Sequence, residues 1–256
     1  MHIMISYPKS GRTWVRFMVN RYLIERLKTP TDDVVKVEEG LANTPNHVVW
    51  THFNGAMLFK KPYWEMGFEY NQLRNLPCVF LARNFYGTIA SAYYHGRNRK
   101  NIFTHEPKAF LRCPRYGIIK LISFYNQIDE IKSLCGSFTA FRYETLQKDP
   151  RSIFVKILQS LGQPIDEGIV DQVVEDGKLA NMQVTAAEEC YAGTWLGEVN
   201  PNADMNENIT VGNNKKYHQL FDSEDLEYID HMIDLLLVNK DADYLEGCLT
   251  PPPIKK

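Results

Sequence analysis

The sequence lacks the long apolar stretches that would place it in a membrane. No apolar run approaches the ~18 residues that a helix needs to cross a bilayer. The first strand is expected from residue 2, which leaves no room for a signal peptide. The five cysteines are odd in number and include no Cys-x-x-Cys pair, a pattern typical of free thiols in a reducing compartment. These absences predict a cytoplasmic protein without membrane insertion.

The sequence also lacks a strong charge of either sign. Its formal net charge is -2, because 29 Lys and Arg residues face 31 Asp and Glu residues. This balance offers no global attraction for nucleic acid, which is therefore not expected as a partner. The seven histidines show no metal-ligand spacing such as His-Glu-x-x-His, so no metal is predicted.

The apolar content suits one substantial core. The chain has 256 residues, of which 44% are hydrophobic and 12% aromatic, and this predicts a single domain over residues 1–256. Apolar runs expected to be buried strands occupy residues 2–6, 47–51, 77–82 and 138–142. Helical patterns occupy residues 12–28, 85–97, 115–134, 151–161 and 223–239. The alternation predicts an α/β fold with a central parallel sheet flanked by helices on both faces.

Residues 183–214 interrupt this alternation. The segment is rich in Gly, Pro and Asn, and its bulky apolar residues are Tyr191, Trp195 and Leu196. A connection of this length between regular elements is typical of a functional loop. We therefore expect a lid that closes over bound substrate.

Residues 5–14, Ile-Ser-Tyr-Pro-Lys-Ser-Gly-Arg-Thr-Trp, form the most informative segment. They join an expected strand to an expected helix, where backbone N–H groups and the positive end of the helix dipole meet an anion. The loop adds two cations and two hydroxyls: Lys9, Arg12, Ser10 and Thr13. A Walker loop would place Gly before the lysine, whereas here Gly11 follows it. The segment predicts a phosphate or sulfate site, with a structural turn bearing solvated charges as the alternative.

The other expected strands also end in polar residues. Arg83, which can grip a phosphate bidentately, follows strand 77–82, and Ser91 lies eight residues further on. His52 and Tyr143 follow two other strands. Because ligands of parallel sheets lie beyond the carboxyl ends of the strands, these residues are expected to share one site with the loop. Taken singly, each has a structural alternative in strand capping, helix surface or core packing.

These segments together resemble the PAPS-dependent sulfotransferases, over about residues 3–235. The segment from Tyr7 to Trp14 is similar to the family's 5′-phosphosulfate loop, and Arg83 with Ser91 is similar to its 3′-phosphate motif. The resemblance implies a P-loop-like three-layer fold. It also implies PAPS as the co-substrate that donates a sulfuryl group, PAP as the product, and no metal.

The resemblance further implies a role for each residue. Lys9 would neutralise the oxygen that joins sulfate to phosphate, and His52 would be the general base that deprotonates the acceptor. Tyr143 would lie against the adenine, and Trp14 would offer a second aromatic face. The 5′-phosphosulfate would be held by Lys9, Ser10, Gly11, Arg12 and Thr13.

The chain departs from the family pattern at two places. Trp50 stands where cytosolic members often have a lysine two residues before the histidine, which places more of the charge stabilisation on Lys9. Thr210 and Val211 replace the basic pair expected before the glycine of the last motif. The residues then expected to close over the 3′-phosphate are Gly212, Lys215 and Lys216.

Two other functions remain open on the sequence alone. A nucleotide or small-molecule kinase would use the same type of loop but needs a magnesium carboxylate that the motifs do not supply. A non-catalytic PAP- or PAPS-binding protein would explain the two departures. The acceptor is expected to be a carbohydrate or another small alcohol, since aromatic residues crowd the stretch 47–70 around the expected base.

Overall fold

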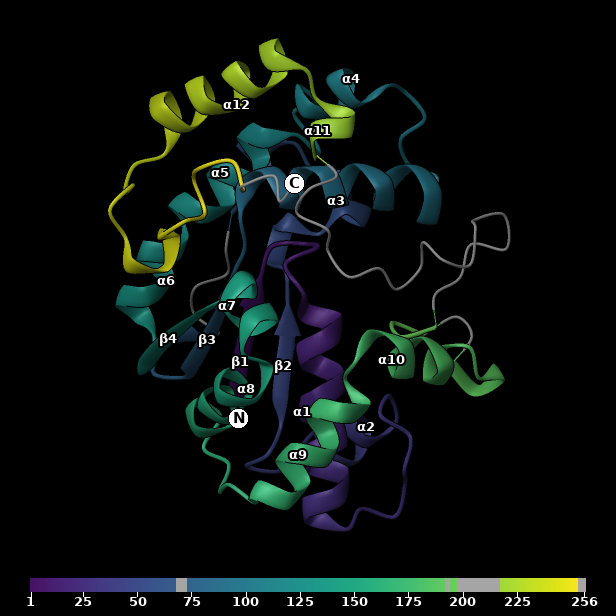
Figure 1. Ribbon diagram of the computed structural model, residues 1–256. Helices are drawn as coiled ribbons and strands as arrows, with labels where there is room; N and C mark the ends of the chain where they lie inside the picture. Colours follow the sequence, from purple (N-terminus) through teal and green to yellow (C-terminus); the bar gives the residue numbers. More distant parts are fainter. Residues whose placement is uncertain (68–72, 192–193, 198–216, 253–256) are drawn as a thin grey trace.

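A computed structural model describes residues 1–67, 73–191, 194–197 and 217–252 (Figure 1). Its four strands pair in the order β2-β1-β3-β4, and all three pairs are parallel. The strands are β1 (His2–Ser6), β2 (Val48–Thr51), β3 (Pro77–Ala82) and β4 (Ser137–Arg142). The predicted α/β fold with a parallel sheet is therefore confirmed.

Helices lie around this sheet (Figure 1). The longer ones are α1 (Arg12–Leu27), α3 (Phe85–Tyr94), α5 (Ile118–Asn126), α8 (Pro150–Ser160), α9 (Glu167–Asp176) and α12 (Ser223–Leu236). The shorter ones are α2 (Val37–Leu41), α4 (Pro107–Leu111), α6 (Ile128–Leu134), α7 (Tyr143–Lys148), α10 (Leu179–Ala186) and α11 (Tyr217–Leu220). A π-helical turn, η5 (His95–Arg99), prolongs α3.

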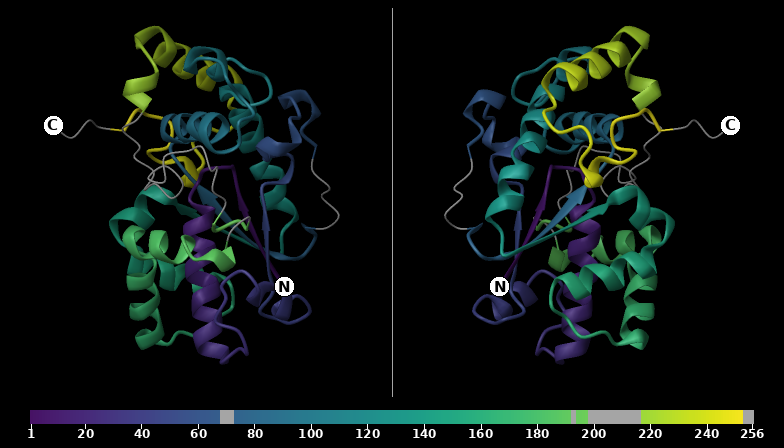
Figure 2. Two further views of the ribbon diagram at one scale, coloured as in Figure 1. Left: turned by 90° about the vertical axis from the view of Figure 1, so that its right-hand side faces the viewer. Right: turned by 90° about the vertical axis from the view of Figure 1, so that its left-hand side faces the viewer.

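The sheet separates two apolar cores, because its strands alternate their side chains between the faces. On one face Ile5 and Phe80 pack with α3, α5, α6 and α12. On the other face Met4 and Leu81 pack with α1, α8 and α9. Figure 1 shows α3, α5 and α12 at the top and α6 at the left, and Figure 2 shows the same two groups after a quarter turn. The result is a three-layer arrangement.

Several helices begin at a side chain that caps them. Asn84 accepts a hydrogen bond from Gly87 N at 3.1 Å at the start of α3, and Asp149 accepts one from Ser152 N at 3.1 Å at the start of α8. Such caps satisfy N–H groups that have no partner within the helix. The start of α1 is different, since its N-cap is Gly11 and makes no side-chain hydrogen bond.

Some expected element boundaries differ from the structure. The helix expected over 115–134 is divided into α5 and α6 at Gln127, whose side chain donates to Met66 O at 3.1 Å. The sequence did not predict α9 and α10. Because residues 183–186 belong to α10, the loop expected over 183–214 begins four residues later in the structure than predicted. Among the described residues no helix is long and apolar enough to cross a membrane.

The order of the strands fixes where a ligand can bind. From β1 the chain passes to β2 on one side, and then to β3 on the other side of β1. Open parallel sheets bind ligands beyond the carboxyl ends of the strands at such a reversal. The segment that follows Ser6 lies at this point.

Candidate active site

The loop after β1 presents an uncapped helix start. Gly11 has φ +91° and Lys9 has φ +70°, so both residues adopt the left-handed conformation that turns the chain into α1. No acidic residue stands in the first turn of α1, and the first N–H groups of a helix have no partner within it. Ser10 is fully buried, and no described residue accepts from or donates to its Oγ. The loop therefore offers donors to an incoming anion.

Tyr143, at the start of α7, packs against the loop. A Cβ atom added to Gly11 would lie 2.4 Å from Tyr143 Cδ2, so only glycine fits against this ring. The Tyr143 ring also meets Trp14 edge to face, with centroids 6.1 Å apart. Tyr143 and Trp14 thus belong to the site as expected, and their contact with an adenine stays a prediction.

Arg83 ties the loop to the neighbouring strand. It follows β3, is 2% exposed, and donates from Nη1 to the carbonyl oxygen of Lys9. Its guanidinium carbon lies 4.6 Å from the centre of the Tyr143 ring, a cation–π contact. Burial lowers the pKa of Arg83, but arginine's ordinary value is high enough that the charge remains at neutral pH. The site therefore contains a buried cation one strand away from Lys9.

Ser91 follows on α3, whose other residues from Phe85 to Tyr93 are buried. Ser91 is partly exposed, so it is the residue of this stretch that can reach a ligand from the helix. Asn84 holds the start of the same helix by donating to Gly247 O at 3.1 Å and Thr250 O at 2.8 Å. The placement fits the predicted anion site but does not test the role of Ser91.

His52 lies on the other side of the loop, just beyond β2. Its Nδ1 is 2.6 Å from the carbonyl oxygen of Ser6, which can only accept a hydrogen bond, so Nδ1 carries the proton. In the neutral ring Nε2 is then unprotonated, and no described residue lies within hydrogen-bond distance of it. Desolvation, and then the charge of Arg12, hold the pKa of His52 well below 6.5. His52 is therefore a neutral base with its free nitrogen available.

The backbone after His52 turns sharply to allow this arrangement. Phe53 has φ +45°, a conformation that a bulky residue rarely adopts. Thr51 stabilises the turn because its Oγ1 accepts from Phe53 N at 2.8 Å. Together with Lys9, Phe53 brings a second strained residue to the same site, where such strain is commonly found.

Arg12, the first residue of α1, contributes a further cation. No described carboxylate lies within 4 Å of it, and it is near enough to lower the pKa of His52. Burial and the neighbouring charge of Arg16 lower the pKa of Arg12 to about 10, so it stays charged at neutral pH. Arg12 thus brings a cation at the end of the loop close to the base.

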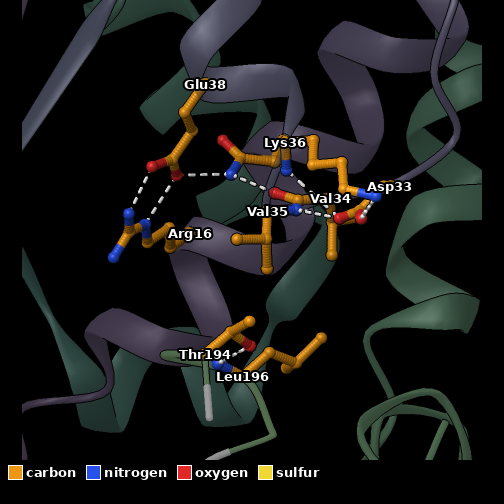
Figure 3. A network of polar contacts seen from close by, with 9 residues as sticks. Arg16, Asp33, Val34, Val35, Lys36, Glu38, Thr194 and Leu196 are labelled. Carbon is orange, nitrogen blue, oxygen red and sulfur yellow. Dashed lines mark hydrogen bonds and ion pairs between the residues drawn. The ribbon is translucent and has the colours of Figure 1, made fainter. Parts of the chain in front are cut away.

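A network that the sequence analysis did not find lies one helical turn further along α1 (Figure 3). Arg16 pairs bidentately with Glu38 of α2, with Nε 2.6 Å from Oε1. Asn20 donates to Glu38 Oε1 at 2.5 Å and to Val34 O at 2.7 Å, which fixes the carboxylate. The only sequence signal was a pair of arginines four residues apart on α1.

Two tryptophans enclose Arg16. Its guanidinium carbon lies 4.3 Å from the ring centre of Trp195 and 5.9 Å from that of Trp50. The indole N–H groups of Trp14, Trp50 and Trp195 are buried, and none has a partner among the described residues. A buried donor without a partner costs about 1–3 kcal/mol. These three indole N–H groups therefore add unpaired polar atoms to an otherwise aromatic region.

Comparison with known proteins decides the family. Residues 2–242 match the family model of the sulfotransferase domain. The chain belongs to the sulfotransferase domain family. This assignment confirms the resemblance drawn from the phosphosulfate-loop and Arg83 motifs.

Curated sulfotransferases match at low identity. Sulfotransferase 1C2 of Homo sapiens is 22% identical over 206 residues, which are 71% of this chain and 65% of that protein. Sulfotransferase 1B1 of Canis lupus familiaris is 24% identical over 197 residues, which are 67% of this chain and 62% of that protein. The match thus spans less than two thirds of the length of either relative.

Solved structures share the sulfotransferase fold. Mouse sulfotransferase SULT7A1 complexed with PAP superposes with a TM-score of 0.63 at 17% identity, covering 97% of this chain and 86% of that chain. Retinol dehydratase in complex with androsterone and inactive cofactor PAP also gives 0.63, at 18% identity, covering 94% of this chain and 81% of that chain. At these identities the likeness establishes the fold, including its P-loop-like three layers.

Part of the predicted sulfotransferase site lies outside the described residues. Gly212, Lys215 and Lys216 fall there, as does most of the expected lid. Of the lid's bulky residues, Tyr191 and Leu196 are buried in the core beside α1, and Trp195 packs over Arg16. These three residues therefore have contacts with the core or with Arg16, which do not test the predicted closure over substrate. Closure of the rest of the segment stays a prediction.

Proposed function

We propose that this chain is a PAPS-dependent sulfotransferase that transfers a sulfuryl group to a hydroxyl of a small-molecule or carbohydrate acceptor, in the cytoplasm. The observation that carries the proposal is the bond from His52 Nδ1 to Ser6 O. It leaves Nε2 as an unprotonated base beside an anion loop that already holds Lys9 and Arg12. A binding protein has no need of such a base, whereas sulfuryl transfer to an alcohol does.

The described residues fit the donor. The uncapped start of α1 and the unpartnered Ser10 Oγ suit a 5′-phosphosulfate. Arg83 follows β3 and Ser91 lies on α3, on the opposite side of β1 from His52. A second phosphate bound there would be kept apart from the reacting sulfuryl group. The two fold neighbours described above are complexes with PAP, which supports the same donor. PAPS supplies a sulfuryl group already activated by its bond to phosphate.

The chain's residues then divide the work of transfer. His52 Nε2 accepts the proton of the acceptor hydroxyl while that oxygen forms its bond to sulfur. The sulfur–oxygen bond to the 5′-phosphate breaks, and its electron pair stays on the phosphate of PAP. Lys9 and the loop N–H groups neutralise the charge that develops on that oxygen. We assign Arg12 to the sulfuryl oxygens, since it directly follows the loop and is close enough to His52 to lower the pKa of that ring.

Arg12 also accounts for the absence of a lysine at position 50. Trp50 lies two residues before His52, on the same side of β2, and its ring faces Arg16. The cation that Trp50 does not supply is present one helical turn from Arg16, at Arg12. The departure at Trp50 therefore does not argue for a non-catalytic protein.

A donor comparison tests the proposal. Calorimetry should show PAP binding much more tightly than ADP, because only PAP carries the 3′-phosphate for Arg83. Purified protein with radiolabelled PAPS should then transfer sulfate to members of an alcohol and sugar library. Binding of ATP with magnesium in preference to PAP would support a kinase instead. Tight PAP binding with no transfer to any acceptor would leave a non-catalytic binding protein.

A further inference from the structure

The side chains of α1 pair with those of β2 and of the residue after it at two levels near the base, which we call the first and second rungs. Arg12 lies near His52, and Arg16 lies over Trp50, two residues earlier on the strand. One turn of helix rises about 5.4 Å, and two strand residues rise about 6.6 Å, so the rungs stay in step along the two elements. The second rung therefore lies about one helical turn from the reacting position, a distance that a six-membered ring can span.

The second rung offers both hydrogen-bond donors and acceptors. The contacts of Arg16 with Glu38 use Nε and Nη2, and no described residue accepts from Nη1. The side chains of Arg16 and Glu38 are 17% and 21% exposed, so both are partly accessible to a ligand. The carboxylate can accept from a hydroxyl while the guanidinium donates to a neighbouring one.

Two indole rings complete the rung. Trp50 and Trp195 are each partly exposed, while their Nε1 atoms are buried without a partner among the described residues. Trp195 is held in place because Tyr191 O accepts from Thr194 Oγ1 at 2.7 Å, and because Leu196 is buried. The buried nitrogens are out of a ligand's reach, so the rings contribute apolar faces.

We propose that Arg16, Glu38, Trp50 and Trp195 form an acceptor subsite that selects a polyhydroxylated ring, a carbohydrate or a cyclitol, over a phenol or a monohydroxy alcohol. The inference rests on the proposed function, because it places the accepting hydroxyl at His52. Sugar hydroxyls both donate and accept, and the C–H groups of a sugar pack on aromatic rings, so one ring can contact Glu38, Arg16 and the indoles together. A phenol or a steroid-like alcohol with its single hydroxyl at His52 has none left for Glu38 and Arg16, and such sites discriminate strongly.

Binding to the PAP complex tests the inference without requiring turnover. Dissociation constants are measured by ligand-observed NMR for methyl hexopyranosides and myo-inositol, and for phenol and cyclohexanol. At least one polyhydroxylated ring should bind about tenfold or more tightly than both monohydroxy compounds. Tighter binding of phenol or cyclohexanol, or no binding of any polyhydroxylated ring, would overturn the inference.

Two variants test the residues themselves. Glu38→Gln and Trp195→Ala should each weaken the best polyhydroxylated ligand by about tenfold while leaving the PAP dissociation constant within about twofold. Glu39→Gln is the matched control, since Glu39 is exposed on the same helix and should change neither. Melting temperatures identify a variant that fails to fold, and the comparison of ligands on the unaltered protein then decides. Equal weakening of sugar and cyclohexanol would also contradict the subsite.

Failure of the inference and failure of the proposed function give different results. If PAP itself does not bind, the proposed function is wrong. If PAP binds and sulfate is transferred, but phenols are the best acceptors, the sulfotransferase proposal stands and the polyhydroxylated class is wrong.

Discussion

The Arg83 guanidinium donates a hydrogen bond to the main-chain carbonyl oxygen of Lys9. The side chain that resembles a 3′-phosphate ligand therefore also holds the loop that would bind the 5′-phosphosulfate. The Tyr143 ring lies against Gly11 and under Arg83, so it supports both. The two anion sites of the proposed donor are thus one connected structure.

Arg83→Ala should weaken PAP binding by about 10- to 100-fold, because one charge-assisted hydrogen bond and the support of the loop are both lost. Discrimination between PAP and AMP, which lacks the 3′-phosphate, should shrink in the same variant. Calorimetry with both nucleotides measures this. Arg115→Ala, an exposed position, is the control. Equal losses for PAP and AMP would limit Arg83 to the support of the loop.

Gly11→Ala should destabilise the protein through two causes, each worth about 1–3 kcal/mol: the left-handed φ and the 2.4 Å approach to Tyr143. PAP affinity should fall with it. Gly40→Ala is the matched control, since nothing lies within 4 Å of its added Cβ and alanine favours helices. Denaturant unfolding of both variants gives the comparison. A Gly11→Ala protein as stable as the control would show that the loop can relax.

His52 should titrate below its ordinary value of 6.5 in the free protein, because desolvation and Arg12 disfavour its charged form. The base is then active at neutral pH, and the acid limb of kcat/KM should lie below pH 6.5. Bound PAP brings negative charge and should raise this pKa. NMR titration of the imidazole, with and without PAP, follows both effects. A free-protein midpoint above 6.5 would contradict the electrostatic account.

Lys9→Ala should reduce turnover by about 10²–10³, the usual cost of removing one group that stabilises developing charge. PAP affinity should fall less than the rate, because the loop N–H groups and Arg83 remain. Steady-state kinetics and PAP calorimetry separate the two effects. A variant within threefold of the unaltered rate would remove Lys9 from the mechanism.

Local patterns sufficed to predict the sheet and the strand ends. The four apolar runs match β1 to β4 to within a residue, because each is a short apolar strand that ends in polar or turn-forming residues. The same reasoning placed Lys9, His52, Arg83 and Tyr143 at one edge of the sheet. Helix α9 was missed even though Asp166 caps it, accepting from Ile169 N at 3.1 Å.

The second rung of the site could not be predicted from local patterns. Arg16 and Glu38 are 22 positions apart, and Trp195 reaches them only through the packing of Leu196 and Tyr191 into the core beside α1. Nothing in the local sequence of Glu38 distinguishes it from Glu39. Likewise, the tautomer of His52 depends on the carbonyl of Ser6, which the strand register brings opposite.

Sulfate transfer by the unaltered protein and by His52→Ala, measured side by side from radiolabelled PAPS to the best acceptor found, tests the central claim most directly. The unaltered protein should transfer sulfate, and the variant should lose about 10²–10⁴ of the rate while binding PAP with little change. A variant that keeps its rate and its pH profile would show that His52 is not the base. No transfer by the unaltered protein to any acceptor would contradict the proposed activity itself.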